Sequence, residues 1–249
     1  MSIQNEQDLR GIRRVGRTVA KALAAMREAA RPGITTQELD DIGARRLRQD
    51  GARSAPQLIY GFPGVNLISV NDEIVHGVPG RRALAPGDIV KLDVTAELEG
   101  YIADAAETIV LPPVTATAAR LRACARAAFG CGLGAAQAGR SVRAIGAAVE
   151  RHVRACGFHV VRELSGHGVG RTIHEEPTVP NYDDPFAGTR LTDGLVITIE
   201  PLIAASYARP VTDADGWTIR THNAAIAAHY EHTIIVWRGG PEIVTGSAA

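Results

Sequence analysis

The predicted secondary structure repeats along the chain, and this repeat constrains the fold more than any other feature. Each half contains two helices followed by strands. Helices are expected at residues 6–30, 36–50, 116–130 and 141–156, the main strands at 88–98, 101–111, 195–200 and 231–236, and shorter extended segments at 58–70, 158–163 and 218–220. Residues 86–90 also resemble residues 192–196. The repeat predicts an α+β fold of two duplicated halves, about 1–113 and 114–249, around one shared site.

The overall charge and composition exclude several classes of protein. The 249 residues include 27 Lys and Arg against 27 Asp and Glu, so the formal net charge is zero, and no direct nucleic-acid partner is expected. No run of 18 apolar residues occurs and the first ten residues lack an apolar signal core, so no membrane span is expected. The three cysteines form no C-x-x-C pair, which favours a reducing compartment, and we expect a cytoplasmic protein.

Two of the acidic residues on the predicted hairpin of the first half are potential metal ligands. If Glu99 and Gly100 form a two-residue turn, Thr95 pairs with Asp104 and Asp93 shares a face with Thr95. Asp93 and Asp104 are then diagonal neighbours, roughly 7–8 Å apart, and one cation can bridge their carboxylates. An odd-length turn would put the two acids on opposite faces, and two surface acids on a half-exposed strand are the alternative interpretation.

Further potential ligands occur in the second half. The glycine-rich segment GHGVGRTIHEEP, residues 166–177, contains His167 and His174, and its glycines let the backbone approach a ligand closely. Glu200 ends the apolar strand 196–199, and Glu231 begins another apolar strand. A buried acid at such a position is costly unless it is paired or bound to a metal.

Asp93, Asp104, His167, Glu200 and Glu231 together offer four carboxylates and one imidazole. This set can compensate the charge of two divalent cations. Its oxygen donors are harder Lewis bases than the Cys and His donors typical of structural zinc sites. Mn, Fe or Co therefore suits this set better, with Zn as a further candidate. Two such cations can lower the pKa of a bridging water and polarise a carbonyl group.

The same residues carry a resemblance to a known family. The chain resembles the methionine aminopeptidases of the short bacterial type I class, in the M24 peptidase family. The matching segments are SVNDEIVHGVP at 69–79, KLD at 91–93 with Asp104 eleven residues later, GHGVGRTIHEEP at 166–177, TIEP at 198–201 and YEHT at 230–233. The resemblance covers nearly the whole chain. It implies a single catalytic pita-bread domain over residues 1–249, with pseudo-twofold halves and a central antiparallel sheet covered by helices.

The resemblance also implies a role for each site residue. Asp93 would bind one metal ion, Asp104 and Glu231 would bridge two, and His167 and Glu200 would complete the coordination. Glu200 would also carry protons to and from the nucleophilic water. His76 would contact the scissile amide or the leaving amine, and His174 would stabilise the carbonyl oxygen of the tetrahedral state.

The methionine pocket is expected to be formed by aromatic and apolar side chains. Phe62 matches an aromatic wall, Trp217 matches an aromatic near the pocket mouth, and Tyr60 is a further lining residue. Five positions depart from the common pattern of the family: Leu67 stands where many relatives have Cys, residues 64–65 are Gly-Val instead of Lys-Ser, and residues 102–103 are Ile-Ala instead of His-Gly. These departures spare the metal ligands and bear on side-chain specificity and turnover.

The implied reaction is removal of the initiator methionine from nascent chains whose second residue is small. The expected partners are nascent polypeptide N-termini, with the ribosome as a candidate location, and we expect a monomer. Two alternatives stay open: an X-Pro peptidase or creatinase-like hydrolase with the same fold and metals, and a non-catalytic binding homologue. The HGVP and GHGVGRTIHEEP segments favour the methionine class over the first alternative, and the complete ligand set argues against the second.

Overall fold

The computed structural model of the chain describes residues 1–246 and consists of helices packed on one large sheet. The helices are α1 (Glu6–Ala29), α2 (Thr36–Gln49), α3 (Ala55–Tyr60), α4 (Ala116–Ala135) and α5 (Val142–Ala155). The strands are β1 (Arg53–Ser54), β2 (Leu67–Val70), β3 (Glu73–Val75), β4 (Ile89–Leu98), β5 (Tyr101–Val110), β6 (His159–Val160), β7 (Ser165–Gly168), β8 (Glu175–Pro180), β9 (Val196–Ile199), β10 (Leu202–Ala204), β11 (Pro210–Thr212), β12 (Ile219–Thr221), β13 (Ala227–His229), β14 (Glu231–Ile235) and β15 (Glu242–Ile243). Among these residues no helix is long and apolar enough to cross a membrane.

The central sheet joins the two halves of the chain. Its nine strands run in the order β1-β4-β5-β14-β9-β7-β8, with β2 added on β4 and β15 on β14, and its pairings are antiparallel. The innermost strands are β5 from the first half and β14 from the second, and each is flanked by another strand of its own half, β4 or β9. The predicted α+β class with duplicated halves around a central antiparallel sheet is therefore confirmed.

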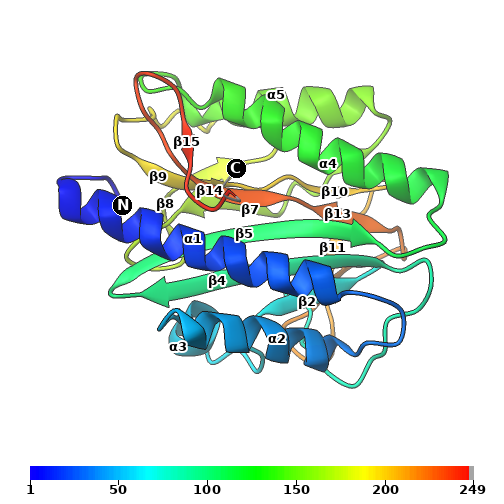
Figure 1. Cartoon of the computed structure of the whole chain (residues 1–249). Helices are drawn as coiled ribbons and strands as arrows, with labels where there is room; N and C mark the ends of the chain where they lie inside the picture. The colour runs from blue at the N-terminus through cyan, green and yellow to red at the C-terminus, as the bar shows by residue number, and fades with distance from the viewer. Residues whose placement is uncertain (247–249) are drawn as a thin grey trace.

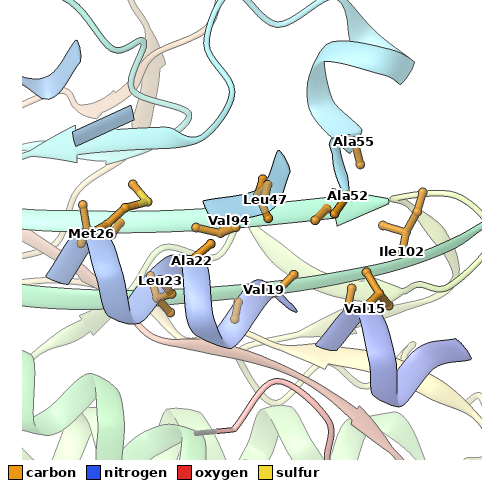
Figure 2. Packing of buried hydrophobic residues seen from close by; sticks show 14 of the residues in the cluster. Val15, Val19, Ala22, Leu23, Met26, Leu47, Ala52, Ala55, Val94 and Ile102 are labelled. Atoms are coloured by element: carbon orange, nitrogen blue, oxygen red, sulfur yellow. The ribbon is translucent and has the colours of Figure 1, made fainter. Parts of the chain in front are cut away.

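The four long helices cover the sheet, and each half supplies one pair (Figure 1). In the first half, α1 begins at Asn5, whose side chain accepts a hydrogen bond from the Asp8 backbone N–H. Its apolar residues then recur every three or four positions and pack on β4 and β5, as Figure 2 shows for Val15, Val19 and Met26. A second core forms where α4 and α5 cover β9 and β14. The helices thus hold the strands rigidly from one side.

Three predicted elements differ from the structure. Residues 58–60 were expected to be extended but end helix α3, because Ser54 caps it, Pro56 suits its first turn and Gly61 ends it with a φ of 71°. Helix α4 continues five residues beyond Gly130 to Ala135, since Gly132 lets it pack closely against Val149 and Ile199. The strand expected at 158–163 is only β6. The strands that were not predicted at all are β1, β3, β7, β8, β10, β11, β13 and β15.

Candidate metal centre and its cavity

Five predicted ligands lie on or directly after five neighbouring strands of the sheet. Asp93 is on β4, Asp104 on β5, Glu231 begins β14, Glu200 follows β9, and His167 is on β7. The register aligns them, because Asp93 and Glu231 both pair with Ala106, and Glu200 follows Ile199, the partner of His232. We call these five residues the carboxylate cluster. Acids from both halves therefore meet at the middle of one sheet.

The hairpin register predicted for Asp93 and Asp104 is confirmed. Leu98 pairs with Tyr101 and Thr95 with Asp104, so the turn contains only Glu99 and Gly100. Both turn residues have positive φ angles, 53° and 80°, as a type I′ turn requires. The even-length turn therefore puts the two carboxylates on one face of the hairpin.

Burial makes the carboxylate cluster electrostatically unfavourable by itself. The four acids are 2–8% exposed. Burial, together with the neighbouring acids, raises the pKa values of Asp93, Glu200 and Glu231 well above their usual range. Burial also raises the pKa of Asp104 to about 6, although hydrogen bonds from Thr95 and Asp93 oppose the shift. Such a group of acids needs either protons or cations to be stable in a fold.

The donor atoms of the cluster fit divalent cations. Within the described residues, Oδ1 of Asp93, Oδ1 of Asp104 and Oε1 of Glu231 are buried without a hydrogen-bond partner. Asp104, His167 and Glu231 offer ligand atoms that all lie within 4.8 Å of one another. Nδ1 of His167 lies 3.0 Å from the Gly168 carbonyl oxygen. That oxygen only accepts, so Nδ1 carries the proton and Nε2 is left with a free lone pair.

A further residue, His229, joins the cluster and was missed by the sequence reasoning. It ends β13 and is 1% exposed. Its Nε2 lies 3.3 Å from Glu231 and 3.8 Å from Glu200, and in the part of the chain that the structure describes neither ring nitrogen has a hydrogen-bond partner. His229 and Asp93 form a second potential metal group with Glu231. The signal available in the sequence was its position two residues before Glu231.

His76 and His174 lie at the same cavity on two loops. His76 follows β3 with a positive φ of 59°. The next residue must be glycine, because a Cβ at Gly77 would overlap the Ile68 carbonyl oxygen. Burial lowers the pKa of His76 to about 4, with a smaller contribution from His174, and burial also lowers the pKa of His174. Both imidazoles are therefore neutral near pH 7.

His174 is fixed by its neighbours. The Tyr60 hydroxyl oxygen lies 2.6 Å from Nδ1 of His174, and the rings of His167 and His174 meet edge to face at 4.4 Å. The adjacent Glu175 accepts backbone hydrogen bonds from Arg171 and Thr172 and pairs with the Met1 ammonium group. These contacts hold the loop that carries His174 against the cavity.

All eleven side chains predicted for the site line one cavity of about 520 Å³. They are Tyr60, Phe62, Leu67, His76, Asp93, Asp104, His167, His174, Glu200, Trp217 and Glu231. Phe62 is buried and meets Trp217 edge to face at 5.3 Å, while Tyr60 is exposed at the cavity mouth. The cavity is open to solvent at this aromatic rim, and the carboxylate cluster also lines it. The individual roles assigned to these residues stay predictions.

Comparisons with known proteins agree with this geometry. The sequence profile of metallopeptidase family M24 matches residues 10–238. Methionine aminopeptidase 2 of Bacillus subtilis is 41% identical over 247 residues, covering 98% of this chain and 99% of that protein. The crystal structure of methionine aminopeptidase from Thermotoga maritima superimposes with a TM-score of 0.96 at 31% identity, over 99% of this chain and 100% of that one. Prolidase from Pyrococcus furiosus superimposes with a TM-score of 0.78 at 21% identity, and the match covers 99% of this chain and 66% of the prolidase chain. This similarity shows a shared fold.

Proposed function

As this chain belongs to metallopeptidase family M24, we infer that it is a metal-dependent methionine aminopeptidase that removes N-terminal methionine from polypeptides. The observation that carries this conclusion is the carboxylate cluster. Its five residues come from five adjacent strands and line one solvent-accessible cavity together with two neutral histidines. The full-length similarity to proteins named methionine aminopeptidases supports the same conclusion.

We propose that the carboxylate cluster holds two divalent cations. Asp93, Asp104, His167, Glu200 and Glu231 would be ligands, and Glu231 is suited to bridge because it belongs to both potential metal groups. His229 would contact a cation as well, since both of its ring nitrogens are unpartnered in the described chain. When bound, the cations lower the pKa of a water molecule and polarise the scissile carbonyl. Mn, Fe and Co match the oxygen-rich donor set best, and Zn is a further candidate.

Glu200 is suited to move the proton of the attacking water. Its Oε1 accepts a hydrogen bond of 2.8 Å from Thr198, which fixes the carboxyl group at the end of β9. Buried beside the cavity, this carboxyl group would accept a proton from the water and return it to the leaving amine. This supports the role of general acid and base implied by the family resemblance.

His174 is suited to stabilise negative charge on the carbonyl oxygen. Since Tyr60 can donate its hydroxyl proton to Nδ1, neutral His174 would carry its own proton on Nε2 and donate it into the cavity. His76, on the loop that follows β3, would contact the scissile amide or the leaving amine. Both roles need uncharged imidazoles, and burial keeps both uncharged.

Phe62, Leu67, Trp217 and Tyr60 would form the pocket for the methionine side chain. The edge-to-face contact of Phe62 with Trp217 gives a stiff apolar wall, and a flexible thioether packs well against aromatic edges. The substrates would be nascent chains with a small second residue, in the cytoplasm and at the ribosome. We further propose that residues 1–249 act as one catalytic domain and as a monomer.

A panel of peptides tests this function. The protein is stripped with EDTA, reloaded separately with Mn, Fe, Co or Zn, and offered Met-Ala-Ser, Met-Leu-Ser and Ala-Pro-Ser. We expect methionine release from Met-Ala-Ser with at least one metal, slower release from Met-Leu-Ser, and none after EDTA treatment. Cleavage of Ala-Pro-Ser alone would favour the X-Pro alternative. If methionine were released with none of the four metals, the proposed function would be overturned.

A further inference from the structure

A second group of potential metal ligands lies between helices α4 and α5. Cys124 comes from the middle of α4, while His152 and Cys156 are four residues apart at the end of α5. We call these three residues the thiol cluster. One ligand atom from each lies within 4.8 Å of the other two. None of the three lines the cavity described above, so the thiol cluster is separate from the carboxylate cluster.

The local structure explains why these side chains meet. Residues four apart on a helix share one face, so His152 and Cys156 point to the same side of α5. Helices α4 and α5 are neighbours connected by a short loop, as Figure 1 shows. Their close packing includes Gly132 of α4 against Val149 of α5. Cys124 is 3% exposed in this contact, whereas His152 and Cys156 are partly exposed at its edge.

The spacing of the donor atoms suits a tetrahedral ion. Sγ of Cys156 lies 3.5 Å from Nε2 of His152. Zinc binds thiolate sulfur at about 2.3 Å and imidazole nitrogen at about 2.0–2.1 Å, and a tetrahedral angle then places the two ligand atoms about 3.5 Å apart. The pair is therefore already at the separation that zinc requires, and Cys124 supplies a third ligand from the facing helix.

We propose that Cys124, His152 and Cys156 form a binding site for a thiophilic cation, with Zn²⁺ as the expected occupant. Two thiols and one imidazole are soft donors, unlike the oxygen-rich donors of the carboxylate cluster. The partial exposure of His152 and Cys156 gives the ion an entry path and leaves a fourth position for water. A bound ion would connect α4 to α5 and so brace the helical layer behind β9 and β14.

The charge state of Cys124 makes binding a proton-releasing event. Burial raises the pKa of Cys124 to about 12, and the neighbouring Cys156 adds to the shift. The nearby Arg120, whose guanidinium group donates a hydrogen bond to the Cys156 carbonyl, opposes this shift. The free thiol is thus protonated at neutral pH, and a cation must displace its proton.

Cobalt absorption gives a direct test, because the carboxylate cluster contains no sulfur. The reduced protein is titrated with Co²⁺, and we expect a near-ultraviolet thiolate-to-cobalt charge-transfer band that Zn²⁺ abolishes by displacement. Cys124→Ser and Cys156→Ser should each lose the band, and His152→Ala should weaken it. Cys131→Ser is the matched control, since Cys131 lies on the same helix but is exposed outside the cluster. Absence of the band in the wild-type protein, or its loss in Cys131→Ser, would overturn the proposal.

A measurement on the unmodified chain guards against variants that fail to fold. The reduced wild-type protein is alkylated with and without Zn²⁺, and the label on each cysteine is quantified by mass spectrometry. Zn²⁺ should protect Cys156 and leave the labelling of Cys131 unchanged. Equal labelling of Cys156 in both conditions contradicts the site, and this outcome does not depend on methionine release. The proposal and the proposed function can therefore fail independently.

Discussion

The carboxylate cluster and the thiol cluster differ in what they need when no cation is bound. The acids of the first are buried in the middle of a sheet, and three of their oxygen atoms are unpartnered within residues 1–246. The second cluster is neutral when its thiols are protonated, and His152 and Cys156 already lie at the distance of a weak S–H···N hydrogen bond. The first arrangement is therefore unstable without cations or protons, while the second is tolerable without an ion.

This difference shows which structural signal reveals each kind of site. A hard-ligand site is visible in its electrostatics, because like charges share a buried volume and raise one another's pKa values. The soft-ligand site holds no buried like charges when its thiols are protonated, and the separation of its donor atoms indicates it. The two clusters also predict opposite responses to mutation and to metal removal.

The largest expected effect is on the proton-moving acid. Glu200→Gln keeps the size of the side chain but removes its charge, so kcat for methionine release should fall by about 10²–10⁴. Released methionine is measured together with the metal content of the protein. Glu99→Gln is the control, because Glu99 is an exposed acid at the hairpin turn, paired with Arg14. Near-normal turnover by a metal-loaded Glu200→Gln protein would remove Glu200 from the proposed mechanism.

Metal removal should destabilise the protein in a pH-dependent way. In the metal-free fold the acids have pKa values raised above the unfolded values of about 4, and that of Asp104 is about 6. A group of this kind stabilises the fold below its unfolded pKa, and this contribution is lost as the pH rises through the folded pKa. The metal-free protein should therefore lose stability between about pH 4 and 6 and beyond.

The measurement is the free energy of unfolding by denaturant across this pH range, with Mn²⁺ and with EDTA. The difference between the two conditions should widen as the pH rises. It should reach about 4 kcal/mol per cation when free metal exceeds Kd a thousandfold. Cys156→Ser should give the same difference, because Mn²⁺ prefers oxygen donors over thiols. A difference that is independent of pH would contradict a metal-free cluster of protonated acids.

A smaller effect is expected at His229, the group with two unpartnered ring nitrogens among the described residues. His229→Leu should weaken Mn²⁺ binding by about 10- to 100-fold in calorimetric titration. The same variant should leave the metal-free protein equally stable or more stable, since it removes a buried imidazole that lacks hydrogen bonds. His229→Gln, whose side chain keeps polar atoms, should restore part of the affinity. A loss of stability without a change in affinity would assign His229 a purely structural role.

Local signals in the sequence were sufficient for the first half of the site. The two-residue turn at Glu99 and Gly100 fixed the register, and the register put Asp93 and Asp104 on one face. The capping box of Thr35 and Glu38 likewise marked the start of α2. These features depend on interactions within a few residues, which a sequence displays directly.

The remaining features depend on packing between distant segments. The alignment of Glu231 with Asp93 arises because β14 pairs with β5, and nothing local specifies that pairing. The contact of Tyr60 with His174 requires helix α3, where an extended segment was expected. Similarly, the spacing of His152 and Cys156 is visible in the sequence, whereas Cys124 joins them only through the packing of α4 on α5.

The smallest effect is expected from the thiol cluster on catalysis. Cys156→Ser should leave methionine release by the Mn²⁺-loaded protein within about twofold of the wild-type rate, and its stability in zinc-free buffer within about 0.5 kcal/mol. The reason is that the cluster needs no ion to be satisfied and none of its side chains lines the catalytic cavity. In zinc-containing buffer, however, the wild-type and Cys131→Ser proteins should gain more stability than Cys156→Ser. Denaturant unfolding of the three proteins, with Mn²⁺ always present, measures this gain. If Cys156→Ser slowed methionine release tenfold in zinc-free buffer, the two clusters would be coupled through α4. The comparison assumes that the clusters are independent, and this result would contradict that assumption.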